Sequence, residues 1–208
     1  VEPFAYMLDV TDENNISTVF SKINKEVGQI DVLINNAGIG VFQLAHEIEL
    51  QTVKNMFQVN VFGAIACTQA VLTEMMERKE GHIIFIASQA GKLATPKSGA
   101  YGATKHAILG YANSLRMEQR ETGVHVSVVN PGPVNTPFFD TADQSGTYRK
   151  NVARYMLTPE KVAEHTVRLI EKPRREVNLP YWMGVGTKLY QLFPSLVETV
   201  AGEQLRKK

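Results

Sequence analysis

The amino-acid sequence predicts an α/β fold built on a parallel sheet, and three observations support this prediction. Strand-like and helix-like segments alternate along the chain, as they do when helices connect parallel strands. Residues 83–87, Ile-Ile-Phe-Ile-Ala, are apolar on both faces, which is typical of a central parallel strand. The chain has 208 residues, 44% of them apolar, which is enough for one core but short for two domains. We therefore expect one domain over residues 1–208.

The N-terminal half is expected to contain two strands and two helices before the central strand. Residues 4–8 form an apolar run that predicts a buried strand. A helix capped by Thr11 or Asp12 should follow and end at Gly28. Its apolar residues share one face: Ile16, Val19, Phe20, Ile23 and Val27. Residues 32–34 predict a second buried strand, and residues 50–76 predict a long helix.

The C-terminal half continues the alternation with one interruption. We expect a helix over 101–121, ending at Gly123, and a strand over 124–129. Residues 136–156 break the pattern, because they are rich in small and polar residues with interspersed aromatic ones, so we expect an irregular lid there. A helix over 159–171, with proline in its first turn, and a short strand over 176–179 complete the expected elements.

Residues 178–208 form a C-terminal extension with four aromatic residues, Tyr181, Trp182, Tyr190 and Phe193. Three interpretations are open. The aromatic residues can pack on the sheet, which we favour, or cover a substrate crevice together with Phe138, Phe139 and Tyr155. The third is that Trp182 and Tyr190 contact a membrane surface with the basic residues Arg206, Lys207 and Lys208, which we do not expect.

The composition argues against several classes of protein. Lysine and arginine (22) nearly balance aspartate and glutamate (21), so no broad basic surface for nucleic acid is expected. The single cysteine, Cys67, cannot form an intrachain disulfide and is expected to fill space in a helix. With no run of 18 apolar residues and no signal-peptide pattern, we expect a cytoplasmic protein without a spanning helix. The 5 histidines lack metal-ligand spacing, so no metal site is expected.

Four polar residues occupy positions that suggest chemistry. Ser88 follows the apolar run 83–87 and should lie at the carboxyl end of that strand, where ligands bind in parallel sheets. Tyr101 and Lys105 are four positions apart, so they share one face of the predicted helix. Asn60 lies on the apolar stripe of its helix. It needs backbone or water partners there, because an unpaired buried polar group costs about 1–3 kcal/mol.

These residue types suit proton transfer coupled to carbonyl reduction. A phenol has an ordinary pKa of about 10, and it exchanges protons near neutral pH only if a nearby cation stabilises its ionised form. Lys105 can supply that charge from one helical turn away. The Ser88 hydroxyl can bond the substrate oxygen on which charge develops, while Tyr101 gives or takes the proton.

Each signal also has a simpler explanation when taken alone. A Tyr-x-x-x-Lys pair is common on helix surfaces, and a serine after a strand is commonly a turn or cap residue. An asparagine in a helix is commonly solvated or bonded locally. The functional interpretation therefore depends on the order and spacing of the motifs.

Five ordered motifs together resemble the classical short-chain dehydrogenase/reductase family. They are Asn-Asn-Ala-Gly at 35–38, Asn60, Ser-Gln-Ala-Gly at 88–91, Tyr-Gly-Ala-Thr-Lys at 101–105 and Pro-Gly-Pro-Val-Asn-Thr at 131–136. Ser88 precedes Tyr101 by 13 positions, a spacing common in that family. The resemblance extends from Asp9 to about Glu171.

The resemblance implies roles for the four candidate catalytic residues. Tyr101 would be the acid/base, and Ser88 would orient and polarise the substrate oxygen. Lys105 would lower the pKa of Tyr101 and bond the nicotinamide ribose. Asn60 would hold a water that extends a proton relay from the lysine.

The resemblance also implies a set of cofactor-binding residues besides Tyr101 and Lys105. Asp9 would contact the adenine amino group, and Asn35, Ala37 and Gly38 would form a turn beside the adenosine. Backbone at Pro131 and Val134, with the Thr136 hydroxyl, would fix the nicotinamide carboxamide. Two alternatives stay open: residues 35–38 can mainly stabilise the sheet, and Asp9 can be a helix N-terminal anion.

Fold, activity and assembly follow from the same resemblance. It implies a doubly wound, Rossmann-like parallel sheet. It also implies hydride transfer between NADP or NAD, with NADP slightly favoured, and a small-molecule carbonyl or alcohol. Separately, an apolar lid over the crevice would favour an apolar substrate. The resemblance also implies a homodimer or homotetramer paired through helices 50–76 and 101–121, with close approach at Gly110, Ala112 and Ser114. The rival hypotheses are a non-catalytic nucleotide-sensing or scaffold protein, and an epimerase or dehydratase that uses the same Tyr101–Lys105 pair.

The sequence departs from the family pattern at its beginning. The family opens with a glycine-rich strand–turn–helix, Thr-Gly-x-x-x-Gly-x-Gly, which seats the cofactor pyrophosphate, and no such motif occurs here. We expect two strand–helix units, roughly 50–60 residues, to be absent upstream. The 208-residue chain by itself is then expected to bind cofactor poorly and to be inactive.

Overall fold

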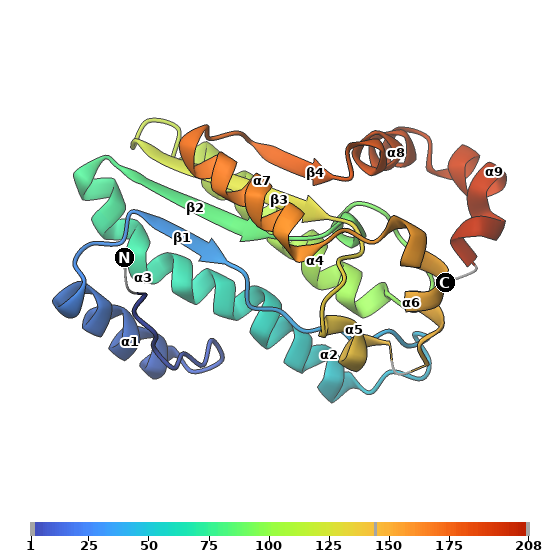
Figure 1. The fold of residues 1–208 in the computed structure, drawn as a ribbon, viewed down its shortest axis with the longest axis horizontal. Helices are drawn as coiled ribbons and strands as arrows, with labels where there is room; N and C mark the ends of the chain where they lie inside the picture. Colours follow the sequence, from blue (N-terminus) through green and yellow to red (C-terminus); the bar gives the residue numbers. More distant parts are fainter. Residues whose placement is uncertain (1–2, 144, 207–208) are drawn as a thin grey trace.

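The described residues of a computed structural model, 3–143 and 145–206, fold around one parallel sheet of four strands (Figure 1). The strands neighbour one another in chain order: β1 (Val32–Asn35), β2 (Gly81–Ile86), β3 (Val124–Pro131) and β4 (Glu176–Leu179). β2 pairs with β3 along its whole length, with Ile83 opposite Val126. Because all the strands are parallel, their carboxyl ends lie at the same edge of the sheet.

Helical segments connect the strands. Those before β2 are α1 (Glu13–Glu26), α2 (Leu50–Phe57), a π-helical turn η1 (Gln58–Gly63) and α3 (Ala64–Arg78). Between β2 and β4 come a 3₁₀ turn η2 (Gln89–Gly91), α4 (Gly99–Glu118), α5 (Phe138–Ala142), α6 (Thr147–Val152), a second 3₁₀ turn η3 (Ala153–Tyr155) and α7 (Pro159–Glu171). α8 (Tyr181–Leu192) and α9 (Pro194–Arg206) follow β4.

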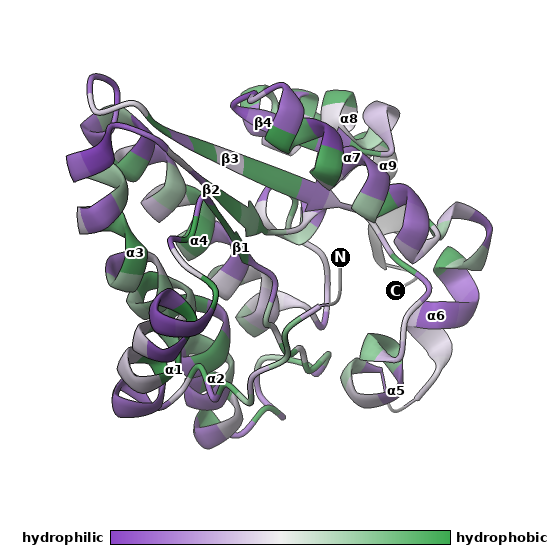
Figure 2. Cartoon of the chain, turned by 60° about the vertical axis from the view of Figure 1, so that its left-hand side comes forward, coloured by the Kyte–Doolittle hydropathy of each residue, from purple (hydrophilic) through white to green (hydrophobic). Residues whose placement is uncertain are grey.

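Alternate side chains of the central strands point into two cores, one on each face of the sheet. On one face Ile83 and Phe85 belong to a cluster with residues of α1, α3 and α4. On the other face Ile84 and Val129 pack with Leu169 of α7. Figure 2 shows α1 to α4 on one side of the sheet and α7 on the other. The doubly wound architecture is thus confirmed, and each fully buried side chain of this size contributes about 1.5–3 kcal/mol.

Capping residues start and stop the helices where the sequence predicts. The Asp12 side chain accepts hydrogen bonds from the backbone N–H groups of Asn14 and Asn15 (2.9 and 3.2 Å), so α1 begins after it. The chain leaves α1 through Gly28, whose φ of 110° is a conformation that favours glycine. Thr158 caps α7 through a bond from Lys161 N (3.3 Å).

The strand predicted over residues 4–8 is not formed. This segment is extended but pairs with none of the four described strands, and Phe4 and Met7 are 65% and 91% exposed. An apolar run becomes a strand only where a neighbouring strand supplies ladder hydrogen bonds. Within the described residues nothing supplies them to this segment, so the prediction of a buried strand is wrong.

The segment predicted as an irregular lid, residues 136–156, is largely helical. It contains α5, α6 and the turn η3, separated by a short connection that includes Gly146 with φ 66°. Aromatic residues at Phe139 and Tyr148 give these short helices an apolar side, and Phe139 is buried. Short helices held by tertiary packing have weak sequence signals, because such packing stabilises helices more than propensity does.

The long helix 50–76 is present but is divided by the π-helical turn η1 into α2 and α3. Taken together, Leu50–Arg78 is long and apolar enough to cross a membrane. This differs from the expectation that the chain contains no helix of that kind. Val61, Cys67 and Val71 of this segment are buried in the core beside the sheet. We therefore interpret it as a core helix, and Cys67 fills space there as expected.

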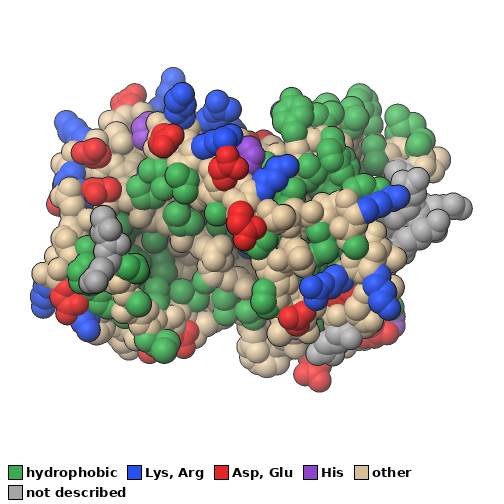
Figure 3. Space-filling view, in the orientation of Figure 1, with side chains coloured by type: hydrophobic (Ala, Val, Ile, Leu, Met, Phe, Trp, Pro, Cys, Tyr) green, Lys and Arg blue, Asp and Glu red, His purple; other side chains and the backbone are tan. Residues whose placement is uncertain are grey.

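The C-terminal extension forms α8 and α9, which lie beyond the edge strand β4 (Figure 1). The favoured interpretation, aromatic packing on the sheet, is largely wrong, since Tyr181, Trp182 and Phe193 are 81%, 55% and 56% exposed. In Figure 3, apolar side chains gather on the surface over this end of the molecule. Lys207 and Lys208, named for a membrane contact, lie outside the described residues.

Candidate active site

A cavity of about 1250 Å³ opens at the carboxyl edge of the sheet. Its wall includes Ser88, two residues after β2, and Pro131, the last residue of β3. Tyr101 and Lys105 reach it from the first half of α4. Ligands bind at this edge in parallel α/β folds. The structure thus brings three of the four predicted catalytic residues into one space.

Ser88 is held by the turn that follows it. Its backbone is extended, and its Oγ accepts a hydrogen bond from Ala90 N (3.1 Å), which starts the 3₁₀ turn η2. Gly91 in this turn lies against α4: a Cβ there would be 2.8 Å from the carbonyl oxygen of Lys105. Glycine at this position therefore lets the serine-bearing turn approach the helix that carries Tyr101 and Lys105.

Tyr101 is buried, and the Ser88 hydroxyl is near enough to its phenol to affect the ionisation of Tyr101. Burial raises the pKa of Tyr101 to about 12, and Ser88 only partly offsets this. The loss of water around the phenol is the largest effect on this pKa, and the expectation that Lys105 lowers it stays a prediction. At neutral pH the Tyr101 hydroxyl is therefore protonated.

Lys105 is also buried, and its Nζ donates to the carbonyl oxygen of Ile86 (3.0 Å) at the end of β2. Burial lowers the pKa of Lys105 to about 8. The ammonium lies 5.7 Å from the centroid of the Tyr101 ring. Gly38 lies on its other side, where a Cβ would be 3.6 Å from Nζ.

Asn60 occupies the π-helical turn η1 and is 2% exposed. Its Oδ1 accepts from Ile39 N (2.8 Å), and its Nδ2 donates to Ile39 O (2.8 Å) and to Thr104 Oγ1 (3.0 Å). We expected backbone groups or water as partners of this amide, and the structure gives it the backbone of Ile39 and the hydroxyl of Thr104. π-Helical turns are frequent at functional sites. Asn60 does not line the cavity. Its hydrogen bonds connect Ile39, in the 38–40 turn, to Thr104 of α4.

The predicted cofactor residues divide into two groups. Gly38, Pro131, Val134 and Thr136 line the cavity together with Tyr101 and Lys105. The remaining three, Asp9, Asn35 and Ala37, are not part of its lining.

Asn35 and Asp9 have structural partners instead. The Asn35 side chain donates to Thr68 Oγ1 (3.1 Å) and so links the end of β1 to α3, in line with the sheet-stabilising alternative. Asp9 is exposed and accepts bonds from the backbone N and hydroxyl of Thr11 (2.8 and 2.7 Å), which lower its pKa. The acidic N-cap of α1 is Asp12, not Asp9.

Aromatic side chains form one wall of the cavity beside Tyr101. Phe42 makes edge-to-face contacts with Tyr101 and Phe138, at centroid distances of 5.8 and 6.3 Å. Phe138 also lies 5.6 Å from the Tyr101 ring, and Phe139 and Tyr148 extend the cluster. This wall joins the 42–44 loop to α5 and α6. It covers part of the Tyr101 ring and so contributes to the burial that raises the pKa of Tyr101.

Trp182 and Met183 of α8 line the same cavity. Trp182 contacts Tyr155 edge-to-face with the ring centroids 5.7 Å apart. The second interpretation of the C-terminal extension, a cover for the crevice formed with Phe138, Phe139 and Tyr155, is therefore supported by the lining.

Sequence reasoning missed several lining residues. Asn36, rather than its neighbour Asn35, faces the cavity, and Phe42 supplies an aromatic wall. Gln89 and Thr187 are buried polar residues of the lining. The alternating exposure of a strand end could have distinguished Asn36 from Asn35. Nothing in a loop sequence marks Phe42.

The arrangement supplies a neutral phenol, a hydroxyl and a buried ammonium beside an apolar wall. Such a set can donate a proton to an oxygen atom and stabilise the charge that develops. Across residues 3–143 and 145–206, no cluster of three His, Cys, Asp or Glu side chains could hold a metal ion.

Comparison with known proteins adds to this geometry. The family model described as short chain dehydrogenase matches residues 2–146. Dehydrogenase/reductase SDR family member 7B of Mus musculus is 32% identical over 99% of this chain and 65% of its own length. Dehydrogenase/reductase SDR family protein 7-like of Drosophila melanogaster is 33% identical over 84% of this chain and 55% of its own.

Solved structures share the fold as well. Serine dehydrogenase, in a closed form complexed with NADP+, is 31% identical with a TM-score of 0.78, over 84% of this chain and 74% of that one. Serine dehydrogenase from Escherichia coli is 29% identical with a TM-score of 0.71, over the same shares. The chain spans about 55–65% of the length of the two curated relatives named above.

Proposed function

The chain belongs to the short chain dehydrogenase family, and from this premise we propose that the protein is an NAD(P)-dependent oxidoreductase acting on a carbonyl or alcohol. The observation that carries the proposal is that Ser88, Tyr101 and Lys105 line one cavity at the carboxyl edge of the sheet. Ser88 precedes the turn η2, and Tyr101 and Lys105 belong to α4, against which Gly91 of that turn packs closely.

The donor set at the cavity fits a nicotinamide cofactor. The Lys105 ammonium and Thr136 hydroxyl can bond ribose and carboxamide oxygens, and the turn containing Asn36 and Gly38 borders the same space. Backbone at Val134 completes this set. A bound nicotinamide would supply or accept the hydride. NADP is slightly favoured over NAD, and the serine dehydrogenase relative solved with NADP+ supports that preference.

In the reducing direction, the residues of this chain would act on the substrate oxygen. The Ser88 hydroxyl donates a hydrogen bond that polarises the carbonyl and holds it beside Tyr101. Tyr101, protonated at neutral pH, transfers its proton to the oxygen as charge develops there. The nearby Lys105 ammonium stabilises the phenolate that Tyr101 becomes. Asn60 holds the 38–40 turn against α4 and thereby positions this set.

The cavity wall favours an apolar substrate. Phe42, Phe138 and Phe139 line the cavity, and the first two contact the Tyr101 ring. Trp182 and Met183 line it from α8. Apolar surface removed from water contributes about 25 cal/mol per Å². A hydrophobic ketone or secondary alcohol would gain this contribution against the aromatic wall.

The open edge of β1 bears on cofactor binding. β1 is an edge strand of the described sheet, and Ile34 and Ile39 beside the cavity are 40% and 41% exposed. We propose that a glycine-rich strand–turn–helix outside residues 1–208 is needed here to seat the pyrophosphate. Calorimetry should then show NADP binding to the full encoded chain and weak or no binding to residues 1–208.

Pairing through the two long helices remains part of the proposal. Gly110 and Ser114 are exposed on α4 and can line such a contact, as can Phe62 (54% exposed) on the adjoining turn. Ala112, expected in the same role, is buried in the core, so it faces the wrong side of α4. Sedimentation equilibrium of the full chain would show a dimer or tetramer if the proposal holds.

The direct test is cofactor oxidation by the full encoded chain with a panel of ketones. Tyr101→Phe should lower kcat by about 10²–10⁴, because proton transfer is lost while the ring still packs. Tyr181→Phe, on α8, 81% exposed and outside the cavity lining, is the matched control and should stay within about twofold of the parent. Equal turnover by parent and Tyr101→Phe would remove the assigned mechanism.

A further inference from the structure

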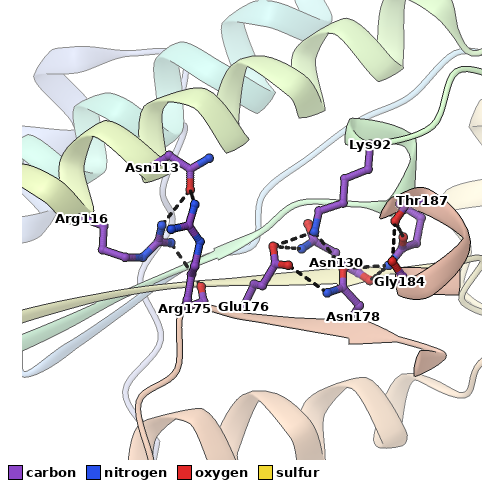
Figure 4. Close-up of polar contacts among 10 residues, drawn as sticks. Lys92, Asn113, Arg116, Asn130, Arg175, Glu176, Asn178, Gly184 and Thr187 are labelled. Carbon is purple, nitrogen blue, oxygen red and sulfur yellow. Dashed lines mark hydrogen bonds and ion pairs between the residues drawn. The ribbon is translucent and has the colours of Figure 1, made fainter. Parts of the chain in front are cut away.

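A buried polar network lies beside the active site, on the side of β4 and α8 (Figure 4). Its centre is the ion pair of Lys92 and Glu176, with Nζ 2.6 Å from Oε2. The Lys92 side chain is 10% exposed and that of Glu176 26%. Lys92 Nζ also donates to Oδ1 of Asn178 (3.0 Å), whose Nδ2 donates to Oε1 of Glu176 (3.2 Å). Three side chains therefore close a ring of charge-assisted bonds.

The charge state of Glu176 fits this ring. Burial alone would raise the pKa of Glu176, but hydrogen bonds from Lys92 and Asn178, with the charges of Lys92 and Arg175, hold it below its usual value. The carboxylate is thus ionised at neutral pH, and Lys92 faces a full negative charge. Breaking one partner of such a pair leaves the other poorly solvated, which makes the geometry strongly preferred.

The network is tied to the turn that carries Ser88. Lys92 follows η2 directly, and its backbone N donates to Gln89 O (2.9 Å). Gln89 Nε2 donates to Asn130 O of β3 (2.8 Å) and to Asn178 Oδ1 (3.2 Å). Ser88 is the N-cap of the same turn. The position of the Ser88 hydroxyl therefore depends on where Gln89 and Lys92 are anchored.

The network is tied equally to α8. Thr187 Oγ1 donates to Gln89 Oε1 (3.5 Å) and to Gly184 O (3.1 Å). Gly184 packs on the Asn178 side chain so closely that a Cβ there would lie 2.6 Å from the Asn178 Cβ. The first turn of the same helix carries Trp182, which lines the substrate side of the cavity. One set of bonds thus holds both the serine turn and the aromatic cover.

We propose that Lys92 and Glu176 are positioning residues that couple the Ser88 turn to the α8 cover of the cavity. The inference rests on the proposed function, in which Ser88 binds the substrate oxygen. With the ion pair intact, the Ser88 hydroxyl is held in a fixed position relative to Trp182 of α8. Without it, η2 and α8 move independently, and Ser88 is displaced from the substrate oxygen. Displacements of about 1 Å at such a group can cost up to about 10²-fold in rate.

The kinetic test is a double-mutant cycle in the full encoded chain, assayed with the ketone that gives the highest turnover. Lys92→Met should lower kcat by about tenfold and leave the KM for cofactor within about twofold. In a Ser88→Ala background the same Lys92→Met change should have an effect below about twofold, because the positioned hydroxyl is already gone. Glu176→Gln, which keeps the volume, should reproduce the pattern, and Lys92→Arg, which keeps the charge, should restore most of the activity.

The control is an ion pair of similar geometry at the other end of the sheet. Arg78 pairs with Asp31 at 2.9 Å, and its side chain is 20% exposed. Arg78→Met should leave kcat unchanged in both backgrounds even if it lowers the melting temperature. A Lys92→Met penalty of equal size with and without Ser88 would overturn the proposal, since Lys92 would then act by another route.

A second measurement separates this inference from the proposed function. Trp182 is the only tryptophan of the chain, so its fluorescence reports on the start of α8 without any turnover. Lys92→Met and Glu176→Gln should increase acrylamide quenching of Trp182, whereas Arg78→Met should not. If Ser88→Ala itself leaves the parent activity unchanged, the proposed function fails, and the quenching alone then decides the coupling. Unchanged quenching in both network variants would overturn it.

Discussion

Lys105 lies one helical turn from Tyr101 on α4, with its Nζ 5.7 Å from the centroid of the tyrosine ring. Both side chains are buried, and burial moves their pKa values toward the neutral forms, to about 8 for Lys105 and about 12 for Tyr101. At neutral pH the lysine is still mostly charged, so the fold keeps an ammonium in a site with little water. Such a group lowers stability where it serves chemistry.

Replacing Lys105 by methionine should therefore stabilise the fold and abolish most of the activity. The pKa of Lys105 is about 8 when folded and about 10.4 in an unfolded chain. The destabilisation is thus complete below pH 8 and fades as the pH rises toward 10.4. Lys105→Met should raise the free energy of unfolding at pH 7 by about 1–3 kcal/mol and by much less at pH 10.

Thermal denaturation at the two pH values measures this difference. Lys161→Met, an exposed lysine on α7, is the control and should change the melting temperature little at either pH. A Lys105→Met variant that is less stable than the parent at pH 7 would show that the bond to Ile86 O outweighs the cost of the buried charge.

Asn60 should contribute to stability through its amide donors. In Asn60→Asp the shape is kept, but the bonds donated to Ile39 O and Thr104 Oγ1 are lost, and a carboxylate meets a carbonyl oxygen. We expect a loss of about 2 kcal/mol or more in the free energy of unfolding, measured in urea. Asn55→Asp, an exposed residue on α2, is the control, and an equal loss in both variants would contradict this account.

Local patterns in the sequence predicted the parts of the site that depend on local geometry. Tyr101 and Lys105 share a face because four residues make about one helical turn. Ser88 follows a strand whose residues 83–87 are all apolar, which predicts that the strand is buried. The expected partners of Asn60 followed from the cost of burying an amide. Each of these predictions depends on a single helix or strand and on the residues within it.

The parts that the sequence did not predict depend on contacts between distant segments. The apolar run at 4–8 lacks a neighbouring strand, so its composition alone misleads. Phe42 and Phe138, which contact the Tyr101 ring, come from a loop and from the start of α5. Lys92 and Glu176 are 84 positions apart, and no spacing rule joins them.

Gly40 sets the position of the aromatic wall. A Cβ on Gly40 would lie 2.5 Å from Cζ of Phe138 and 3.2 Å from Cδ2 of Tyr101. Gly40→Ala should push the Phe138 ring into the cavity, because Cζ is the far end of the Phe138 side chain and that side chain can rotate. We expect KM for bulky apolar ketones to rise about tenfold and KM for acetone-sized ketones to change little, with a stability loss of about 1–3 kcal/mol.

Steady-state kinetics with ketones of graded size measure this effect. Gly99→Ala is the matched control, since a Cβ at Gly99 meets nothing within 4 Å. If Gly40→Ala raised KM equally for small and bulky ketones, Phe138 would not limit the substrate space.

His82 should make the fold sensitive to mild acid. Ser127 Oγ donates to Arg174 O (2.6 Å), so it must accept from His82 Nε2 (2.8 Å), which leaves the lone pair of buried Nδ1 with no partner among the described residues. Protonation would place an N–H there without an acceptor. Burial and the neighbouring His125 lower the pKa of His82 to about 4.

The sign of the pH effect follows from that pKa. Between about pH 6.5 and 4 the unfolded chain binds a proton at His82 and the folded chain does not, so stability falls as the pH falls through this window. His82→Gln, which can still donate to Ser127, should lose about 1–3 kcal/mol of this pH dependence in urea titrations at pH 6.5 and 4.5. His46→Gln, at an exposed position, is the control and should keep the parent dependence. Parallel pH profiles for His82→Gln and the parent would mean that the buried imidazole accepts its proton without cost.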